Sequence, residues 1–179
     1  LQAAKCMEKG IRKVFSSAII QTVPIADGGE GTVEALVSAS KGIYKTNTVT
    51  GPLGRPVKAV WGRLPDGTAV IESAAASGLP LVKPEERDPL AATTYGTGEL
   101  IRAALDEGCR RIVLGIGGSA TTDGGAGMAQ ALGVSLRDAQ GREIGFGGGT
   151  LSAAVALDAA GLDPRLRETE IVAACDVRN

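Results

Sequence analysis

The residues best suited to chemistry lie in a glycine-rich loop at residues 115–127. A short β-branched apolar stretch ends there, and six glycines, two threonines, one serine and one aspartate follow. Glycines let successive backbone N–H groups turn toward one anion, and the N-terminus of a following helix adds partial positive charge. The loop therefore predicts a phosphate site, and its chemistry points to phosphoryl transfer.

Oxygen donors in the same loop suit a magnesium ion that accompanies a phosphate. Mg²⁺ prefers oxygen ligands and usually reaches a protein through one or two carboxylates and the phosphates of a nucleotide. Asp123 is the predicted Mg²⁺ ligand, although a carboxylate at this point also fits a cap of the next helix. The predicted phosphate-binding residues, all of them glycines or hydroxyl residues, are Gly117, Gly118, Ser119, Thr121, Gly124 and Gly125.

A second glycine loop, at residues 27–32, precedes another expected helix. Asp27 ends the apolar stretch before this loop, and Glu72 and Asp176 likewise follow the ends of expected strands. Ligands bind at the carboxyl ends of strands in open α/β sheets, so these carboxylates are candidates for binding and proton transfer. Each has a structural alternative: Asp27 can close its own turn, Glu72 and Asp176 can be solvated, and Glu30 is favourable at any helix N-terminus.

The composition excludes several classes of function. Nineteen Lys+Arg against twenty Asp+Glu give a net charge of -1, and aromatic residues make up 3% of the chain, so nucleic-acid binding lacks a basic patch and stacking platforms. The chain contains no histidine, which excludes Ser-His-Asp and Cys-His catalysis within it and leaves a carboxylate as the general base. No membrane span, signal peptide or close cysteine pair is indicated, so we expect a cytoplasmic protein.

Hydrophobic periodicity and turn residues predict alternating helices and strands around the two loops. This alternation is typical of an α/β fold, with an antiparallel patch formed by the strands before residue 73. The expected helices cover residues 1–15, 32–42, 98–107 and 125–132, and the expected strands cover residues 18–25, 44–50, 57–64, 69–72, 111–116, 134–136 and 171–175.

Two familiar nucleotide-binding motifs differ in how well they match the main loop. The P-loop requires a lysine after its glycines, and no lysine follows Lys83 in this chain. A dinucleotide fingerprint is matched in part by Gly115, Gly117 and Ala120, with Asp138 about twenty residues further on. Polar and glycine residues nevertheless separate this match from the next expected helix. A dehydrogenase and a non-catalytic phosphate-binding module therefore remain alternatives to a kinase.

Seven segments, in this order, resemble the bacterial glycerate kinases of the glyoxylate and glucarate pathways. They lie at residues 24–32, 51–54, 72–78, 93–98, 115–121, 123–128 and 174–177. The resemblance implies ATP-dependent phosphorylation of D-glycerate by a Rossmann-like parallel α/β domain together with a second, mixed α/β domain. It assigns residues 1–50 to the first domain and residues 51–179 to the second. It also implies a partial chain that lacks the family's N-terminal strand and C-terminal half.

The resemblance further implies a role for each loop. ATP and Mg²⁺ are the implied cofactors, with the ATP phosphates on the loop at residues 117–125, and glycerate is the implied small-molecule partner. Asp176 first, and Asp27 second, would accept the proton of the reacting hydroxyl. Arg55 is the candidate cation for the substrate, no nucleic-acid or membrane partner is expected, and the oligomeric state stays open. The residues implied to hold glycerate are Asp27, Gly28, Gly29 and Glu30.

Overall fold

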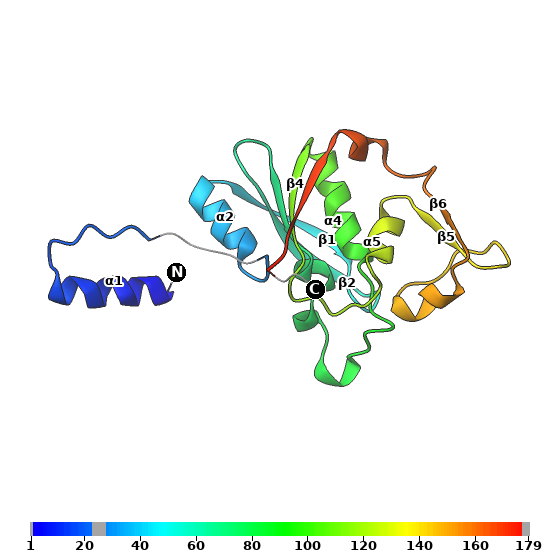
Figure 1. Cartoon of the computed structure of the whole chain (residues 1–179), viewed down its shortest axis with the longest axis horizontal. Helices are drawn as coiled ribbons and strands as arrows, with labels where there is room; N and C mark the ends of the chain where they lie inside the picture. The colour runs from blue at the N-terminus through cyan, green and yellow to red at the C-terminus, as the bar shows by residue number, and fades with distance from the viewer. Residues whose placement is uncertain (1, 23–27, 177–179) are drawn as a thin grey trace.

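The fold is given by a computed structural model that describes residues 2–22 and 28–176. Figure 1 shows a central sheet with helices beside it, and a small second sheet formed by later segments of the chain. The helices are α1 (Gln2–Val14), α2 (Thr32–Ser40), α3 (Ala74–Ser77), α4 (Tyr95–Asp106) and α5 (Ala126–Ala131), with 3-10 turns η1 (Leu79–Leu81), η2 (Pro84–Glu86), η3 (Gly148–Ala153) and η4 (Pro164–Glu168). The strands are β1 (Ile43–Thr50), β2 (Pro56–Arg63), β3 (Ala69–Glu72), β4 (Arg111–Gly115), β5 (Ser135–Arg137), β6 (Ala156–Asp158) and β7 (Glu170–Ala174).

Five strands form one mixed sheet in the order β1-β2-β3-β4-β7. The first three strands pair antiparallel, whereas β3, β4 and β7 run parallel to one another. The predicted α/β class and the predicted antiparallel patch are thereby confirmed. The predicted boundary between the two domains, after residue 50, falls between β1 and β2. These two strands are hydrogen-bonded neighbours in this mixed sheet.

The core lies between this sheet and its covering helices. Leu100 of α4 and Ile71 of β3 are both fully buried in the larger hydrophobic cluster, and burial of each such side chain contributes roughly 1.5–3 kcal/mol. Val70, the neighbour of Ile71, instead packs against Val33 and Val37 of α2. Adjacent residues of a strand point to opposite faces of the sheet, so α2 and α4 cover opposite faces.

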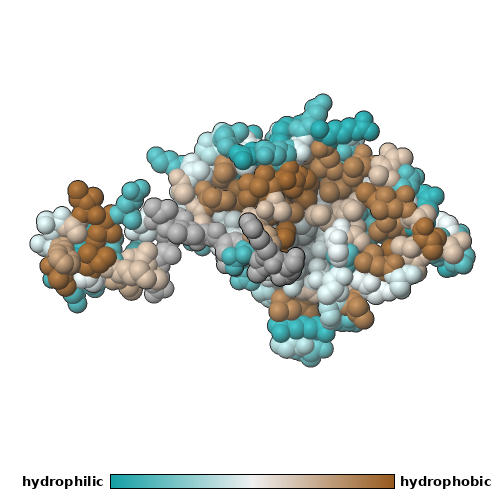
Figure 2. All heavy atoms as spheres, in the orientation of Figure 1, coloured by the Kyte–Doolittle hydropathy of each residue, from teal (hydrophilic) through white to brown (hydrophobic). Residues whose placement is uncertain are grey.

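The helix predicted at the N-terminus is present as α1, but the strand expected after it is not found in residues 18–22. The remainder of that expected strand overlaps residues 23–27, which lie outside the described residues. A strand requires a neighbour for its backbone hydrogen bonds, so an apolar sequence alone does not create one. Met7, Ile11 and Val14 of α1 are 67%, 44% and 75% exposed, and Figure 2 shows the apolar surface along this helix.

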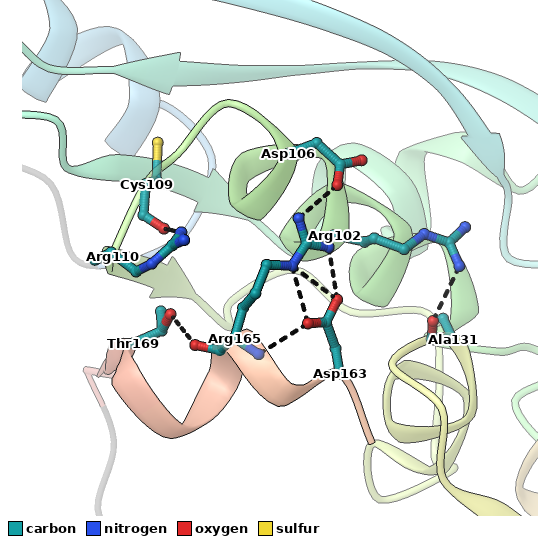
Figure 3. Close-up of polar contacts among 8 residues, drawn as sticks. All are labelled: Arg102, Asp106, Cys109, Arg110, Ala131, Asp163, Arg165 and Thr169. Atoms are coloured by element: carbon teal, nitrogen blue, oxygen red, sulfur yellow. Dashed lines mark hydrogen bonds and ion pairs between the residues drawn. The ribbon is translucent and has the colours of Figure 1, made fainter. Parts of the chain in front are cut away.

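One arginine ties η4 to α4. Arg165 lies 2.6 Å from the carboxylate of Asp163 and 2.7 Å from that of Asp106, and Figure 3 shows its guanidinium between the two carboxylates. Hydrogen bonds from the Arg165 side chain hold the pKa of the Asp163 carboxyl below its usual value. Because these pairs are partly exposed, each adds little stability. Their effect is to orient the segment that leads into β7.

Candidate active site

The carboxyl ends of three parallel strands meet at one edge of the sheet. The register places Glu72 of β3 beside Gly115 of β4, and Gly115 beside Ala174 of β7. Backbone hydrogen bonds extend this row, because the N–H of Ile116 donates to the carbonyl of Ala174 at 3.3 Å and that of Ser73 donates to Gly115 at 2.8 Å. The main glycine loop and the segment after β7 therefore leave the sheet side by side.

The first glycine loop lies directly on this edge. The N–H of Gly117 donates to the carbonyl of Gly28 at 3.1 Å. A Cβ on Gly115 would lie 2.5 Å from the same carbonyl oxygen, and a Cβ on Gly28 would overlap the carbonyl of Ala174. Gly28 also has a φ of 88°, a conformation that favours glycine. The structure thus brings the two predicted loops together, and the absence of side chains permits their close approach.

Two glutamates near these loops have different surroundings. The Oε1 atom of Glu72 accepts the N–H of Val33 at 2.7 Å, so Glu72 caps α2 and is not the solvated strand end that the sequence also allowed. Glu30 is exposed, and its Oε1 atom lies 4.0 Å from the position that a Cβ on Gly118 would occupy. An exposed carboxylate therefore faces the glycine that is predicted to bind phosphate.

Asp123 is buried, with 2% of its surface exposed. Its Oδ2 atom accepts the N–H and the hydroxyl of Thr94, both at 2.8 Å, and the N–H of Gly127 at 3.2 Å. Its Oδ1 atom accepts the N–H of Gly125 at 3.1 Å. These are the contacts of a helix cap, and through Thr94 they join the start of α5 to the start of α4. Mg²⁺ ligation by Asp123 stays a prediction.

The predicted phosphate loop differs along its length in how its backbone donors are used. The N–H of Gly125 is donated to Asp123, and that of Gly117 is donated to Gly28. Within residues 28–176, no hydrogen bond uses the N–H of Gly118 or Ser119, and Gly118 has a φ of 72°. Adjacent open amides next to a left-handed residue form a concave site for an anion. The geometry therefore concentrates the candidate phosphate site on Gly118 and Ser119.

A cavity of about 220 Å³ opens beside the main loop. Thr121 of the loop lines it together with Arg87, which comes from the excursion between β3 and α4. Sequence reasoning missed Arg87 because residues 83–89 look like a charged connector far from the loop, and its positive charge was the only signal. Arg55, the cation expected from the sequence, instead pairs with Glu86 at 3.1 Å.

The remaining predicted residues are distributed as follows. Asp176 is exposed just after β7, Gly124 is exposed, and Gly29 is half-buried. Asp27 lies outside the described residues. Across the residues that the structure does describe, no group of three or more His, Cys, Asp or Glu side chains could hold a metal ion. A Mg²⁺ ion at this edge would therefore depend on phosphate oxygens for most of its ligands.

The fold contradicts the dehydrogenase alternative. In a dinucleotide-binding fold, the ribose-binding acid follows a neighbouring strand of the same parallel sheet. Asp138 instead follows β5, which forms a two-stranded antiparallel sheet with β6. The carboxylate of Asp138 accepts the N–H groups of Gln140 and Arg142, so it closes a local turn. The partial match at residues 115–120 is therefore not a dinucleotide fingerprint.

Comparison with known proteins decides the family. The model of the family described as "Glycerate kinase family" matches residues 1–179, the whole of this sequence. The chain belongs to the glycerate kinase family. The resemblance recognised from the seven sequence segments is thereby confirmed. Among the described helices, none combines the length and apolar character needed to cross a membrane.

Individual relatives in this family are similar over nearly the whole chain. The chain is 58% identical to glycerate 2-kinase of Escherichia coli (strain K12) over 99% of its own length and 47% of that protein. It is 57% identical to glycerate kinase of Bacillus subtilis (strain 168), covering 100% of this chain and 47% of the relative. A crystal structure of a protein provisionally named glycerate kinase 2, from Salmonella typhimurium LT2, superimposes with a TM-score of 0.88 at 54% identity and covers 98% of this chain and 48% of the other. The chain thus spans about half the length of the relatives that it matches.

Proposed function

We propose that the protein containing this chain is an ATP-dependent kinase that phosphorylates D-glycerate. The observation that carries the proposal is the meeting of two glycine loops at the carboxyl ends of β3, β4 and β7, beside open amides and exposed carboxylates. Membership of the glycerate kinase family and the names of the relatives support glycerate as the substrate. Phosphoryl transfer depends mainly on positioning and charge neutralisation, which such an edge is suited to provide. A cytoplasmic location fits this use of ATP.

In this proposal, the open N–H groups of Gly118 and Ser119 bind a phosphate of ATP. Gly118 leaves the space for the anion, because a Cβ at this position would lie 3.3 Å from the Cβ of Ala74 and would stand beside the amides. Thr121 adds a hydroxyl at the rim of the neighbouring cavity. The N–H of Gly125 does not bind phosphate in this proposal, because it already donates to Asp123.

Mg²⁺ is the second cofactor in the proposal. Glu30 places a negative charge close to Gly118, and this charge would repel a bound phosphate unless a cation offset it. Mg²⁺ on the ATP phosphates supplies this neutralisation when it is bound. Glu30 is the accessible carboxylate beside it, whereas Asp123 is held by four hydrogen bonds and keeps the loop in position.

Glycerate lies between the two loops in this proposal, with its hydroxyls toward Gly28, Gly29 and Glu30. The reacting hydroxyl oxygen bonds to the γ-phosphorus as the bond from that phosphorus to the bridging oxygen of ADP breaks. The hydroxyl proton passes to a carboxylate, which is Asp176 after β7 or Asp27 of the first loop. A carboxylate that accepts this hydrogen bond also orients the hydroxyl for attack.

Transfer of labelled phosphate from ATP to glycerate tests the proposal directly in the full-length enzyme. We expect Mg²⁺-dependent transfer, with ³¹P NMR identifying whether the 2- or the 3-hydroxyl has reacted. The substitution Gly118→Val should abolish ATP binding, because its side chain enters the phosphate space and opposes a φ of 72°. Calorimetric ATP affinity that is unchanged in this variant would remove the phosphate site from Gly118.

A matched control separates this local effect from general backbone strain. Gly67 has a φ of 84° in the turn between β2 and β3, and no atom lies within 4 Å of the position of its Cβ. Gly67→Val should therefore lower stability and leave ATP affinity intact. A complementary substitution, Asp27→Asn, should weaken the use of glycerate with ATP affinity nearly unchanged. The opposite pattern would exchange the roles of the two loops.

A further inference from the structure

The cavity beside the main glycine loop is the right size for a small metabolite. Its volume of about 220 Å³ lies below the 300–1,000 Å³ typical of pockets for drug-sized ligands, so it suits a molecule of a few heavy atoms better than a whole nucleotide. Its lining includes the hydroxyl residues Ser119, Thr121 and Thr122 and the apolar residues Leu79 and Val82.

Arg87 is the one cationic residue among those that line this cavity. Asp88 also lines it, but its Oδ1 atom accepts the N–H groups of Leu90 at 2.9 Å and Ala91 at 3.3 Å. The neighbouring Arg55 is paired with Glu86, whereas Arg87 forms no ion pair within the described part of the chain. Arg87 is thus a cationic residue without an ion-pair partner among the described residues, and it lines a small cavity together with hydroxyl residues. A planar guanidinium matches a carboxylate with two parallel hydrogen bonds.

The cavity also adjoins the proposed phosphate site. The N–H of Leu79 donates to the carbonyl of Gly118 at 2.9 Å, and the N–H of Ala120 donates to the carbonyl of Ser77 at 2.9 Å. These two bonds fix the wall of the cavity to the loop that carries the open amides. An acid that fills the cavity therefore lies beside Ser119, one of the two residues with an open amide.

We propose that this cavity binds the carboxylate end of the substrate acid and that Arg87 is the residue that selects for that carboxylate. This inference rests on the proposed function, since it assigns the substrate's charged group to a place within the same site. With the carboxylate at Arg87, the hydroxyl end of the acid is directed toward Gly118 and the first glycine loop. Arg87 is a specificity residue in this assignment and takes no part in proton transfer.

The test compares glycerate with its neutral amide, glyceramide, in the full-length enzyme. Arg87→Met should raise the KM for glycerate by about 10- to 100-fold, the range expected for loss of a charge-assisted hydrogen bond, with kcat and the KM for ATP little changed. The preference for glycerate over glyceramide, expressed as the ratio of kcat/KM values, should fall by a similar factor. Arg87→Lys keeps the charge and should restore part of the preference.

Lys83→Met is the matched control, because Lys83 is an exposed cation on the same segment and does not line the cavity. It should leave the KM values and the substrate preference unchanged. A wild-type enzyme that does not phosphorylate glycerate would overturn the proposed function itself. An active wild-type enzyme whose Arg87→Met variant keeps its preference for glycerate would overturn only the assignment of Arg87. If Arg87→Met changed only the KM for ATP, the cavity would bind part of the nucleotide, and the assignment of Arg87 to the substrate carboxylate would be overturned.

Discussion

Both glycine loops start a helix with a left-handed glycine and a carboxylate that accepts backbone N–H groups, but the carboxylate comes from a different part of the chain in each loop. Gly31 before α2 and Gly125 before α5 have φ values of 94° and 82°, and neither helix is capped by the side chain of its N-cap residue. A carboxylate instead accepts the first free N–H groups in each case. For α5 it is Asp123, two residues before Gly125, whereas for α2 it is Glu72, at the end of a strand that comes later in the chain.

This difference shows how each loop is held. The first loop depends on the sheet, because Gly28 touches β7 and Glu72 comes from β3. The second loop depends largely on its own aspartate, which adds a link to α4 through Thr94. Changes to the first loop should therefore disturb the sheet edge. Changes to the second loop should disturb the contact between α4 and α5.

The largest effect is expected where the first loop meets the sheet. Gly28→Ala should destabilise the protein by roughly 2–5 kcal/mol, since it combines a left-handed backbone with overlap of the Ala174 carbonyl. Gly31→Ala has a similar φ, but no atom lies within 4 Å of the Cβ position, so it should cost only about 1–2 kcal/mol. Denaturant unfolding of both variants measures the difference, and equal losses would show that the sheet contact contributes nothing.

The next effect concerns the aspartate of the second loop. Asp123→Asn should cost about 2–3 kcal/mol, because an amide cannot accept all four hydrogen bonds that the buried carboxylate accepts. The loss should be the same in the presence and absence of Mg²⁺. Thermal unfolding of the variant checks this. Unchanged stability together with a loss of Mg²⁺ affinity would instead identify Asp123 as the metal ligand.

A smaller effect is expected for the distant cap of the first loop. Glu72→Gln keeps an acceptor for the N–H of Val33 and removes the charge, so it should cost about 0.3–1 kcal/mol. Glu72→Ala removes the acceptor as well and should cost about 0.5–2 kcal/mol. Hydrogen exchange of the Val33 amide should accelerate more in the alanine variant. Identical exchange in both variants would mean that Glu72 does not cap α2.

The smallest effect is expected at Asp163 and Arg165, which lie outside both loops. Hydrogen bonds from Arg165 lower the pKa of Asp163 in the folded state from its ordinary value of 3.8. A depressed folded pKa contributes stability above the unfolded pKa, and this contribution disappears as the pH falls through the folded pKa. Asp163→Asn should therefore make the unfolding midpoint depend less steeply on pH below about pH 4 than in the wild type, and Arg165→Met should do the same. A pH dependence as steep as that of the wild type in both variants would contradict this.

Local sequence signals predicted most elements but misplaced some of their ends. The three early strands and α2 follow the expected ranges closely, and α4 ends one residue before the expected residue 107. α4 begins at Tyr95 and not at residue 98, because Gly96 and Gly98 belong to the helix. A Cβ on either glycine would overlap a carbonyl, of Thr50 or of Met128 respectively, so these glycines serve close packing and not a loop. Such a requirement comes from distant residues and has no local signal.

The sequence by itself determined that this chain carries two glycine loops, several carboxylates and no histidine, and the order of its motifs indicated the family. The tertiary structure decided which groups remain available for a ligand. It bonds the N–H of Gly117 to the first loop and that of Gly125 to Asp123, and it brings Arg87 to a cavity beside Gly118 and Ser119. The physical reason is that a donor's availability depends on its neighbours in space, and those neighbours come from segments far apart in the chain.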